Sequence, residues 1–282
     1  MTDETVKLLT ASEFRKYRES HEEDQYELVD VRHPEEYLDE HIPGSKLIPL
    51  PELESRIFEL PPDRELVFYC RSGVRSMAAA SLALEAEVTQ KPIYNLTGGI
   101  LAWQDRVLTD LPKLEALDPK APLASLLYTA MDLEKGAWRF YEHLRIAHAG
   151  EPFAKTFEEL SKAETGHAHM VYQYWKKTQE DPPPFESLYF ELPGEILEGG
   201  EPLRDLLSRL DAGGPEEASG SKTLICVRLM EISMMIELAA YDLYRIMADV
   251  STASEGREIF LSIAQAEKGH IRVLTRALGE CP

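Results

Sequence analysis

The chain has 282 residues, 44% of them hydrophobic and 28% charged, a composition that excludes an intrinsically disordered protein. The 50 acidic and 30 basic residues give a net charge of −20, so we expect neither nucleic acid nor an anionic membrane as a partner. The length predicts two domains. The first residues form no basic and apolar leader, and three cysteines cannot form a disulfide framework, so we expect a cytoplasmic, reducing location.

Residues 1–112 alternate short apolar runs with helical segments. The apolar runs predict buried strands at 27–31, 65–69 and 92–96. Between them, the pattern predicts helices at 12–19, 35–40, 53–58, 75–87 and 99–105. Because buried strands separated by helices usually form a parallel sheet with helices on its faces, this part predicts an α/β domain.

The first candidate site is a cysteine loop, in which Cys70 directly follows the strand predicted at 65–69 and precedes a helix. Backbone N–H groups and the positive end of the helix dipole favour a thiolate there, and Arg71 and Arg75 add positive charge. We therefore predict that Cys70 is a nucleophile; the alternative is a buried apolar cysteine, against which the flanking arginines argue. The cradle for a bound anion or persulfide would be formed by the loop residues Ser72, Gly73 and Val74.

Three further motifs surround this loop in chain order: Val29-Asp-Val-Arg-His-Pro-Glu-Glu-Tyr37, His41-Ile-Pro-Gly-Ser45 and Leu96-Thr-Gly-Gly-Ile-Leu-Ala-Trp103. With them, residues 6–108 resemble a single-domain rhodanese. The resemblance implies a sulfurtransferase, in which Cys70 takes sulfur from a small sulfane donor, becomes a persulfide and passes the sulfur to a thiol acceptor. Arg71 and Arg75 would be catalytic residues that bind the anion.

Two details of this loop bear on the prediction. The loop from Cys70 to Arg75 has the form Cys-x₄-Arg, one residue shorter than the Cys-x₅-Arg loop of related phosphatases, which favours sulfur over phosphate chemistry. Asp30 and Arg32 match the pair at a strand end in rhodaneses, where we expect a structural as much as a functional role; the alternative is a surface ion pair.

Beyond this domain, three prolines within 111–122 predict a semi-rigid linker at 113–122. Apolar residues then recur at spacings of three and four in four segments, 123–148, 152–178, 222–250 and 255–279. A long polar connection, 180–221, separates the second segment from the third. Four helices with one long crossover match the ferritin-like version of an all-α four-helix bundle, which we predict for residues 123–282.

The helical half contains an internal repeat. Glu134 lies 30 residues before the motif Glu164-x-x-His167, and Glu237 lies 30 residues before the motif Glu267-x-x-His270. At a rise of about 1.5 Å per residue, this spacing places the members of each half at one height across an antiparallel helix pair. The repeat therefore predicts four carboxylates and two imidazoles at one level of a bundle core.

Buried carboxylates at one level would repel each other, and two metal ions remove that penalty. Oxygen and imidazole ligands without thiolates suit iron or manganese. For a single motif, a solvated glutamate and an ordinary core histidine would be the simpler interpretation, but the duplication argues against it. Tyr141 and Tyr244, each two helical turns after a predicted ligand, are either hydrogen-bond donors to the carboxylates or aromatic core residues.

This half resembles the rubrerythrin branch of the ferritin-like family over about 150 residues. The resemblance implies a dinuclear iron site, reduction of oxygen or peroxide, and a homodimer. The sequence departs from rubrerythrins at two points: Ala240 stands where many carry a further glutamate, and the chain has no Cys-x-x-Cys motif for a rubredoxin-like iron site.

The two halves allow two hypotheses. The first is a persulfide-forming sulfurtransferase fused to a dinuclear iron oxidoreductase, in sulfur or peroxide metabolism. The second is an iron-binding or peroxide-sensing protein whose rhodanese domain is a non-catalytic docking module. Of the remaining cysteines, we expect Cys226 in the helical core and Cys281 to be mobile near the C-terminus.

Overall fold

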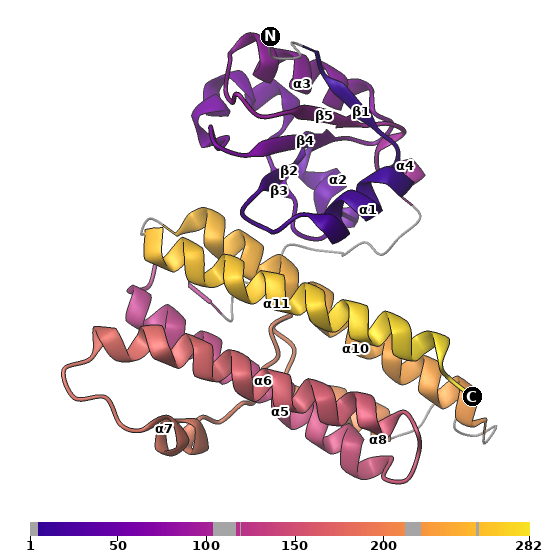
Figure 1. Cartoon of the computed structure of the whole chain (residues 1–282), viewed down its shortest axis with the longest axis vertical. Helices are drawn as coiled ribbons and strands as arrows, with labels where there is room; N and C mark the ends of the chain where they lie inside the picture. The colour runs from indigo at the N-terminus through magenta and orange to yellow at the C-terminus, as the bar shows by residue number, and fades with distance from the viewer. Residues whose placement is uncertain (1–4, 104–116, 119, 212–220, 252–253) are drawn as a thin grey trace. The chain divides into compact units, whose positions relative to one another are not determined.

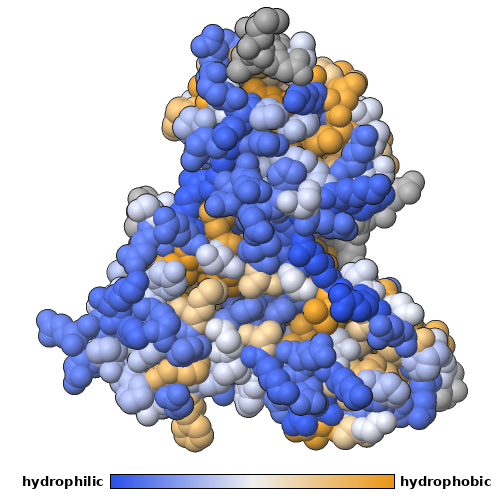
Figure 2. Space-filling model, viewed as in Figure 1, coloured by the Kyte–Doolittle hydropathy of each residue, from blue (hydrophilic) through white to orange (hydrophobic). Residues whose placement is uncertain are grey.

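The computed structural model describes residues 5–103, 117–118, 120–211, 221–251 and 254–282. The chain divides into two compact units, Met1–Leu111 and Pro112–Pro282, which are described separately (Figure 1). Half of the predicted linker, 113–122, lies outside the described residues. Across the described ranges, no helix combines the length and the apolar character needed to span a membrane. The visible face of both units is largely hydrophilic (Figure 2), as expected from the net charge of −20.

The first unit is built on a sheet whose neighbouring strands are all parallel (Figure 1). Its strands, in the spatial order β1-β5-β4-β2-β3, are β1 (Lys7–Leu9), β2 (Tyr26–Asp30), β3 (Lys46–Leu47), β4 (Glu65–Tyr69) and β5 (Ile93–Leu96). The three predicted strands are the central ones, β2, β4 and β5. The two edge strands were not predicted, because each has only two or three residues and none of these is fully buried.

Helices cover both faces of this sheet. They are α1 (Ala11–Ser20), α2 (Pro34–Asp39), α3 (Val74–Glu85) and α4 (Gly99–Ala102), with the 3-10 helices η1 (Leu50–Glu52) and η2 (Glu54–Glu59). In β4, Leu66 and Phe68 join one apolar cluster with α3, whereas Val67 and Tyr69 join another with Phe14 of α1. Alternate residues of β4 are thus buried on opposite faces, which confirms the predicted α/β arrangement. The segment predicted as a helix at 53–58 forms the tighter 3-10 helix.

The second unit contains four long helices, α5 (Leu123–Ala147), α6 (Ala154–Trp175), α10 (Lys222–Val250) and α11 (Ser254–Gly279). Each lies where the sequence predicts a helix. Helices α5 and α6 form one adjacent pair and α10 and α11 form another (Figure 1). A short 3-10 helix, η3 (Lys176–Thr178), extends α6.

The apolar core of this unit has two clusters, and every long helix contributes to both. Along α5, the residues up to Leu133 belong to the first cluster and those from Phe140 belong to the second. Along α10 the order is reversed, with Met234 in the second cluster and Ala240 in the first. Glu134 and Glu237 lie between these limits, so a polar layer crosses the core and has apolar side chains above and below it.

The crossover between α6 and α10 has more structure than the sequence analysis predicted. It contains α7 (Phe185–Glu191), α8 (Leu203–Asp211) and a loop that is closed by an antiparallel bridge between Ile196 and Pro202. Leucines 203, 206 and 210 of α8 are buried in the second apolar cluster. Their spacing of three and four is the signal of an amphipathic helix, which the glycines and prolines around it obscured.

The prediction for Cys281 was wrong, because the structure pairs it with Cys226 in a disulfide whose Cα atoms lie 5.8 Å apart. The residues after α11 run beside the start of α10, where the Thr223 hydroxyl donates a hydrogen bond to the carbonyl oxygen of Pro282. Cys226 is buried in the core as predicted. Cys70 remains the free cysteine of the chain.

Candidate functional sites

Cys70 directly follows the carboxyl end of β4, and the loop 71–73 connects it to α3. Its Sγ accepts a hydrogen bond of 3.1 Å from the backbone N–H of Gly73, the residue before the first turn of α3. Gly73 has a φ of +95°, and a Cβ there would lie 3.1 Å from the backbone nitrogen of Gly98. A glycine is therefore required at this point of the loop to aim the amide at the sulfur.

The predicted cradle is completed by two residues that the sequence analysis missed, Ser76 and Asn95. The Ser76 hydroxyl lies 3.4 Å from Sγ of Cys70 and 2.6 Å from Oδ1 of Asn95, and its single proton can go to either acceptor. Nδ2 of Asn95 donates to the carbonyl oxygen of Gly73 at 3.1 Å, so β5 holds the loop. Burial raises the pKa of Cys70, but hydrogen bonds from Ser76 and from backbone N–H groups of the loop outweigh it, and the pKa is lowered.

Burial of Cys70 contradicts the expectation that flanking arginines would keep it accessible, because only 1% of the residue is exposed. The start of α4 packs directly on its backbone: the N–H of Ile100 donates to the carbonyl oxygen of Cys70 at 2.8 Å. A Cβ at Gly99 would lie 2.1 Å from the same oxygen. The thiol is therefore buried beneath the loop, whereas the cradle residues Ser72 and Val74 are exposed to solvent.

The two predicted catalytic arginines have different surroundings. Arg75 forms a two-pronged ion pair with Glu36 at 2.6 and 2.7 Å, which holds the pKa of that carboxyl at about 2. Arg71 is exposed. The alternative of a surface ion pair for Asp30 and Arg32 was wrong: both are buried, and the Arg32 guanidinium binds Asp30 and the carbonyl oxygen of Glu40.

The second unit brings all six predicted metal ligands together in the polar layer of its core. We call this group the carboxylate cluster; its members are Glu134, Glu164, His167, Glu237, Glu267 and His270. The two Glu-x-x-His motifs contain four of these residues, and each of the four offers one oxygen or nitrogen atom. These four atoms all lie within 4.8 Å of one another. The imidazole rings of the two histidines stack with centroids 4.7 Å apart, so the two halves of the repeat meet face to face.

Both imidazoles present Nδ1 to the carboxylates. Nδ1 of His167 lies 3.2 Å from Glu134 and 3.3 Å from both Glu164 and Glu267. Nδ1 of His270 lies 2.9 Å from an oxygen of Glu237, 3.1 Å from Glu267 and 3.2 Å from Glu164. One nitrogen thus faces three carboxylates in each half, which is more acceptors than one N–H can satisfy.

Tyr141 and Tyr244 are hydrogen-bonded to the cluster across the bundle. The Tyr141 hydroxyl of α5 donates to Oε1 of Glu237 on α10, and the Tyr244 hydroxyl of α10 donates to Oε1 of Glu134 on α5 at 2.6 Å. Each tyrosine also belongs to an apolar cluster, so both interpretations offered by the sequence describe it. This crossed pairing fixes one oxygen of each carboxylate and leaves the other directed at the histidines.

Several ligand atoms of the cluster lack hydrogen bonds although they are buried. Within the described part of the chain, Oε2 of Glu134, Oε1 of Glu164 and Nδ1 of His167 make no hydrogen bond, although each lies within 3.3 Å of an ion-pair partner. Burial raises the pKa of Glu134 to about 8 and that of Glu237 well above its usual range. Buried polar atoms normally have partners, so these atoms and this chemistry fit cations bound between the side chains.

The two imidazoles carry the positive charge that the cluster itself supplies. Burial opposes the charged form of each, but the surrounding carboxylates outweigh burial and raise the pKa of both His167 and His270. Their charge in turn overcomes the effect of burial on Glu164 and Glu267 and lowers the pKa of each. The two cationic rings thus offset the charges of Glu164 and Glu267, whereas the raised pKa of Glu134 and of Glu237 favours their protonated form.

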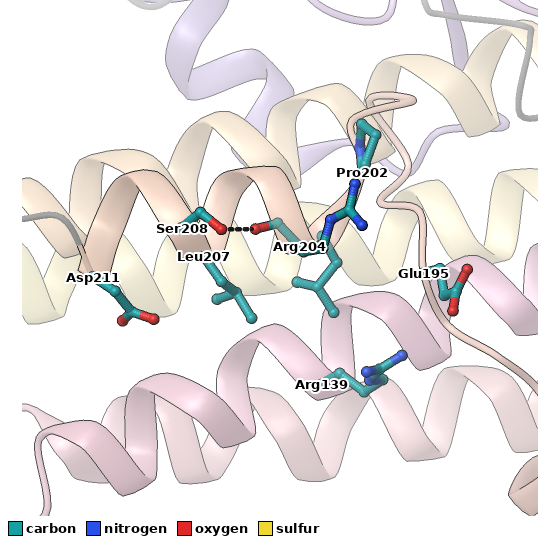
Figure 3. A pocket seen from close by; sticks show the side chains of 8 residues that line it. Arg139, Glu195, Pro202, Arg204, Leu207, Ser208 and Asp211 are labelled. Atoms are coloured by element: carbon teal, nitrogen blue, oxygen red, sulfur yellow. Dashed lines mark hydrogen bonds between the residues drawn. The ribbon is translucent and has the colours of Figure 1, made fainter.

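A separate hollow of about 530 Å³ lies between α5 and α8 (Figure 3). Figure 3 shows polar and charged side chains around it, with Arg139 of α5 on one side and Arg204 and Asp211 of α8 on the other. None of the cluster residues lines it. The hollow is therefore distinct from both candidate sites.

Comparison with known proteins concerns the first unit. Residues 10–106 match the family described as Rhodanese-like domain. The chain is 38% identical over 103 residues to YqhL of Bacillus subtilis (strain 168), covering 36% of this chain and 75% of that protein. It is 40% identical over 76 residues to a sulfurtransferase of Allochromatium vinosum, covering 27% of this chain and 69% of that protein. A rhodanese-like domain protein from Staphylococcus aureus aligns at 27% identity and a TM-score of 0.33, covering 37% of this chain and 99% of its own. Through the unit that carries Cys70, the chain belongs to the rhodanese-like family.

Proposed function

We propose that the first unit is a sulfurtransferase that forms a persulfide on Cys70. The observation that carries this proposal is the hydrogen bond from the Gly73 N–H to Sγ, in a loop that lowers the pKa of the thiol. The sulfurtransferase of Allochromatium vinosum is a relative at 40% identity, which supports the same chemistry. The substrates would be a small sulfane donor and a thiol acceptor.

The proposed reaction has two displacement steps. The Cys70 thiolate attacks the outer sulfur of a donor such as thiosulfate, so that an Sγ–S bond forms, the donor's S–S bond breaks and sulfite leaves. An acceptor thiolate then attacks the terminal sulfur, takes it as its own persulfide and regenerates the Cys70 thiolate. The loop N–H groups would stabilise the negative charge on the terminal sulfur in the intermediate.

Incubation with thiosulfate followed by intact-protein mass spectrometry tests this proposal. We expect a mass gain of one sulfur atom on the wild-type chain and loss of thiosulfate:thiol turnover to the background rate in Cys70→Ser. Ser81→Ala on α3 is the matched control, since it leaves Cys70 and the disulfide in place. Turnover of an aryl phosphate that depends on Cys70, without persulfide, would instead favour a phosphatase.

We propose further that the carboxylate cluster of the second unit holds two metal ions, iron with manganese as the alternative. The buried carboxylate and imidazole atoms without hydrogen-bond partners carry this proposal. The ligands would be the two Glu-x-x-His motifs together with Glu134 and Glu237, and the tyrosine hydroxyls would orient the last two carboxylates. A bound iron pair would supply electrons for reduction of oxygen or peroxide, which makes this unit an oxidoreductase.

Metal analysis of the purified full chain tests the second proposal. We expect about two ions per chain in the wild type and a sharp fall in Glu164→Ala. Glu158→Ala is the matched control on the same helix, because Glu158 is an exposed residue paired with Lys162. Metal content that is equal in both variants would contradict the assignment.

The burial of Cys70 favours a second candidate function for the first unit. Only 1% of Cys70 is exposed, as expected if this unit transfers no sulfur. The first unit would then be a docking module attached to an iron-binding or peroxide-sensing bundle. This alternative predicts that no sulfane donor places a persulfide on Cys70 while the metal content stays at about two ions per chain.

A further inference from the structure

A further carboxylate, Glu198, is buried in the second unit and comes from the crossover rather than from a long helix. Only 2% of the residue is exposed, and its Oε2 has no hydrogen-bond partner in the ranges that the structure describes. It lies close enough to Glu134, Glu164 and Glu267 to experience their charges. Its carboxyl group therefore lies near the carboxylate cluster, as the geometry of the loop also requires.

The first part of the crossover loop, residues 194–196, is fixed to α5 on both sides of Glu134. The N–H of Gly194 donates to Oδ1 of Asp132 at 2.8 Å, and the Arg139 guanidinium donates to the carbonyl oxygen of Gly194 at 3.1 Å. A Cβ at Gly136 would lie 2.4 Å from the carbonyl oxygen of Ile196, so only glycine allows this approach. The loop is thus held at the height of the cluster.

The second part of the loop, residues 197–201, contacts α10. The N–H of Leu197 donates to the carbonyl oxygen of Glu201 at 2.9 Å, which closes a tight turn around Glu198. A Cβ at Gly199 would lie 3.4 Å from Cβ of Ala239, two residues after the ligand Glu237. The backbone on both sides of Glu198 is therefore fixed, one side against α5 and the other against α10.

This placement disfavours the ionised form of the Glu198 carboxyl group. A buried carboxylate without a donor loses hydration, and neighbouring carboxylates add repulsion. The adjacent loop residues Glu195 and Ile196 are exposed, so the loop can direct polar side chains to solvent where nothing favours burial. Cations in the cluster would offset both penalties, since carboxylate oxygens are suitable ligands for iron and manganese.

We propose that Glu198 is an additional ligand of the metal centre, supplied by the crossover loop. This inference rests on the proposed metal centre in the second unit. It adds a ligand that lies outside the helical repeat, and metal binding would further stabilise a loop that α5 and α10 already hold in place.

Anaerobic titration of the metal-free full chain with Fe(II) in the presence of a competing chelator tests the proposal, using Glu198→Gln and the matched control Glu195→Gln from the same loop. We expect Glu198→Gln to weaken the binding of at least one ion by roughly tenfold or more, and Glu195→Gln to match the wild type. Hydrogen exchange gives a second readout: Fe(II) should protect the amides of Leu197 and Gly200 in the wild type and protect them less in Glu198→Gln.

The thermal stability of the metal-free variants separates a ligand from a structural residue. Because Glu198→Gln removes a carboxyl group from among carboxylates, the metal-free protein should be as stable as the wild type or more stable, and only the stabilisation by Fe(II) should shrink. If the wild type binds about two ions and Glu198→Gln binds them with unchanged affinity and loop protection, the assignment of Glu198 is overturned and the metal centre stands. If the wild type binds no ion, both are overturned.

Discussion

The two candidate sites handle negative charge in opposite ways. At Cys70, one developing thiolate meets backbone N–H groups of a loop and the start of a helix, so the fold supplies the stabilising dipoles. In the second unit, the helical repeat brings together four carboxylates and two imidazoles, and several of their buried atoms make no hydrogen bond. The fold supplies the stabilising groups of the first site, whereas the second is proposed to bind cations. Changes to the backbone should therefore affect the first site most, and removal of cations should affect the second.

The largest effect is expected where the backbone frame around Cys70 is disturbed. In Gly99→Ala, the new Cβ would lie 2.1 Å from the carbonyl oxygen of Cys70 at a residue with a φ of +56°. We expect the first unit to lose about 3 kcal/mol or more of its free energy of unfolding. Scanning calorimetry measures the loss, and persulfide formation should fall with it. Leu101→Ala, at an exposed position of the same helix, is the control; equal effects of both changes would contradict this account.

The next effect concerns the second unit alone. Metal ions that bind only the folded bundle should stabilise it by about 3 kcal/mol at a free concentration a hundredfold above the dissociation constant. Removal of metal by a chelator should therefore lower the unfolding temperature of the bundle and leave that of the rhodanese unit unchanged. Calorimetry of the full chain with and without chelator resolves the two transitions. A shift in both, or in neither, would show that the two sites do not differ as described.

A smaller effect is expected from the tyrosines that support the cluster. Tyr141→Phe removes the donor to Glu237, and Tyr244→Phe removes the donor to Glu134. Loss of such a partner costs about 10-fold to 100-fold in metal affinity, whereas Tyr128→Phe, at a partly exposed position of α5, should cost nothing. Competition with a chelator measures the affinities. If all three variants bind Fe(II) equally well, the tyrosines serve only as core residues.

The smallest effect is a shift in the pH profile of sulfur transfer. Hydrogen bonds from Ser76 and the loop lower the pKa of Cys70, so the reactive thiolate is present at lower pH than for an ordinary thiol. Ser76→Ala removes one donor and raises that pKa, which moves the acid limb of the rate profile to higher pH by about one unit or less. Ser81→Ala, on the same helix, removes a hydroxyl that donates to the carbonyl oxygen of Met77, and it should leave the profile unchanged. A shift to lower pH in Ser76→Ala would contradict the assigned role.

The sequence predicted those features that periodicity or repetition encodes. The buried runs around Val29, Val67 and Asn95 are central strands, and the spacing of the two Glu-x-x-His motifs brought their side chains into one layer. Both depend on local pattern, because a strand alternates its faces and a helix returns to the same face after three or four residues.

Features that depend on contacts between distant segments escaped prediction. Glu198 lies in a loop without periodicity, and its burial depends on glycines at 136 and 194 that let the loop approach α5. The partner of Cys281 depends on where the chain runs after α11, and the burial of Cys70 depends on the packing of Gly99 against its carbonyl. In each case the contact that decides the structure joins residues far apart in the sequence. No periodic spacing of residue types marks such a contact, so it cannot be predicted from the sequence.

The most direct test of the account is an anomalous-difference map at the iron edge from crystals of the full chain grown with Fe(II). The account predicts two peaks within the polar layer, bounded by the two Glu-x-x-His motifs, with Glu134 and Glu237 as ligands. Density for water or for a lysine side chain at those points, with the carboxylates turned away from one another, would contradict it.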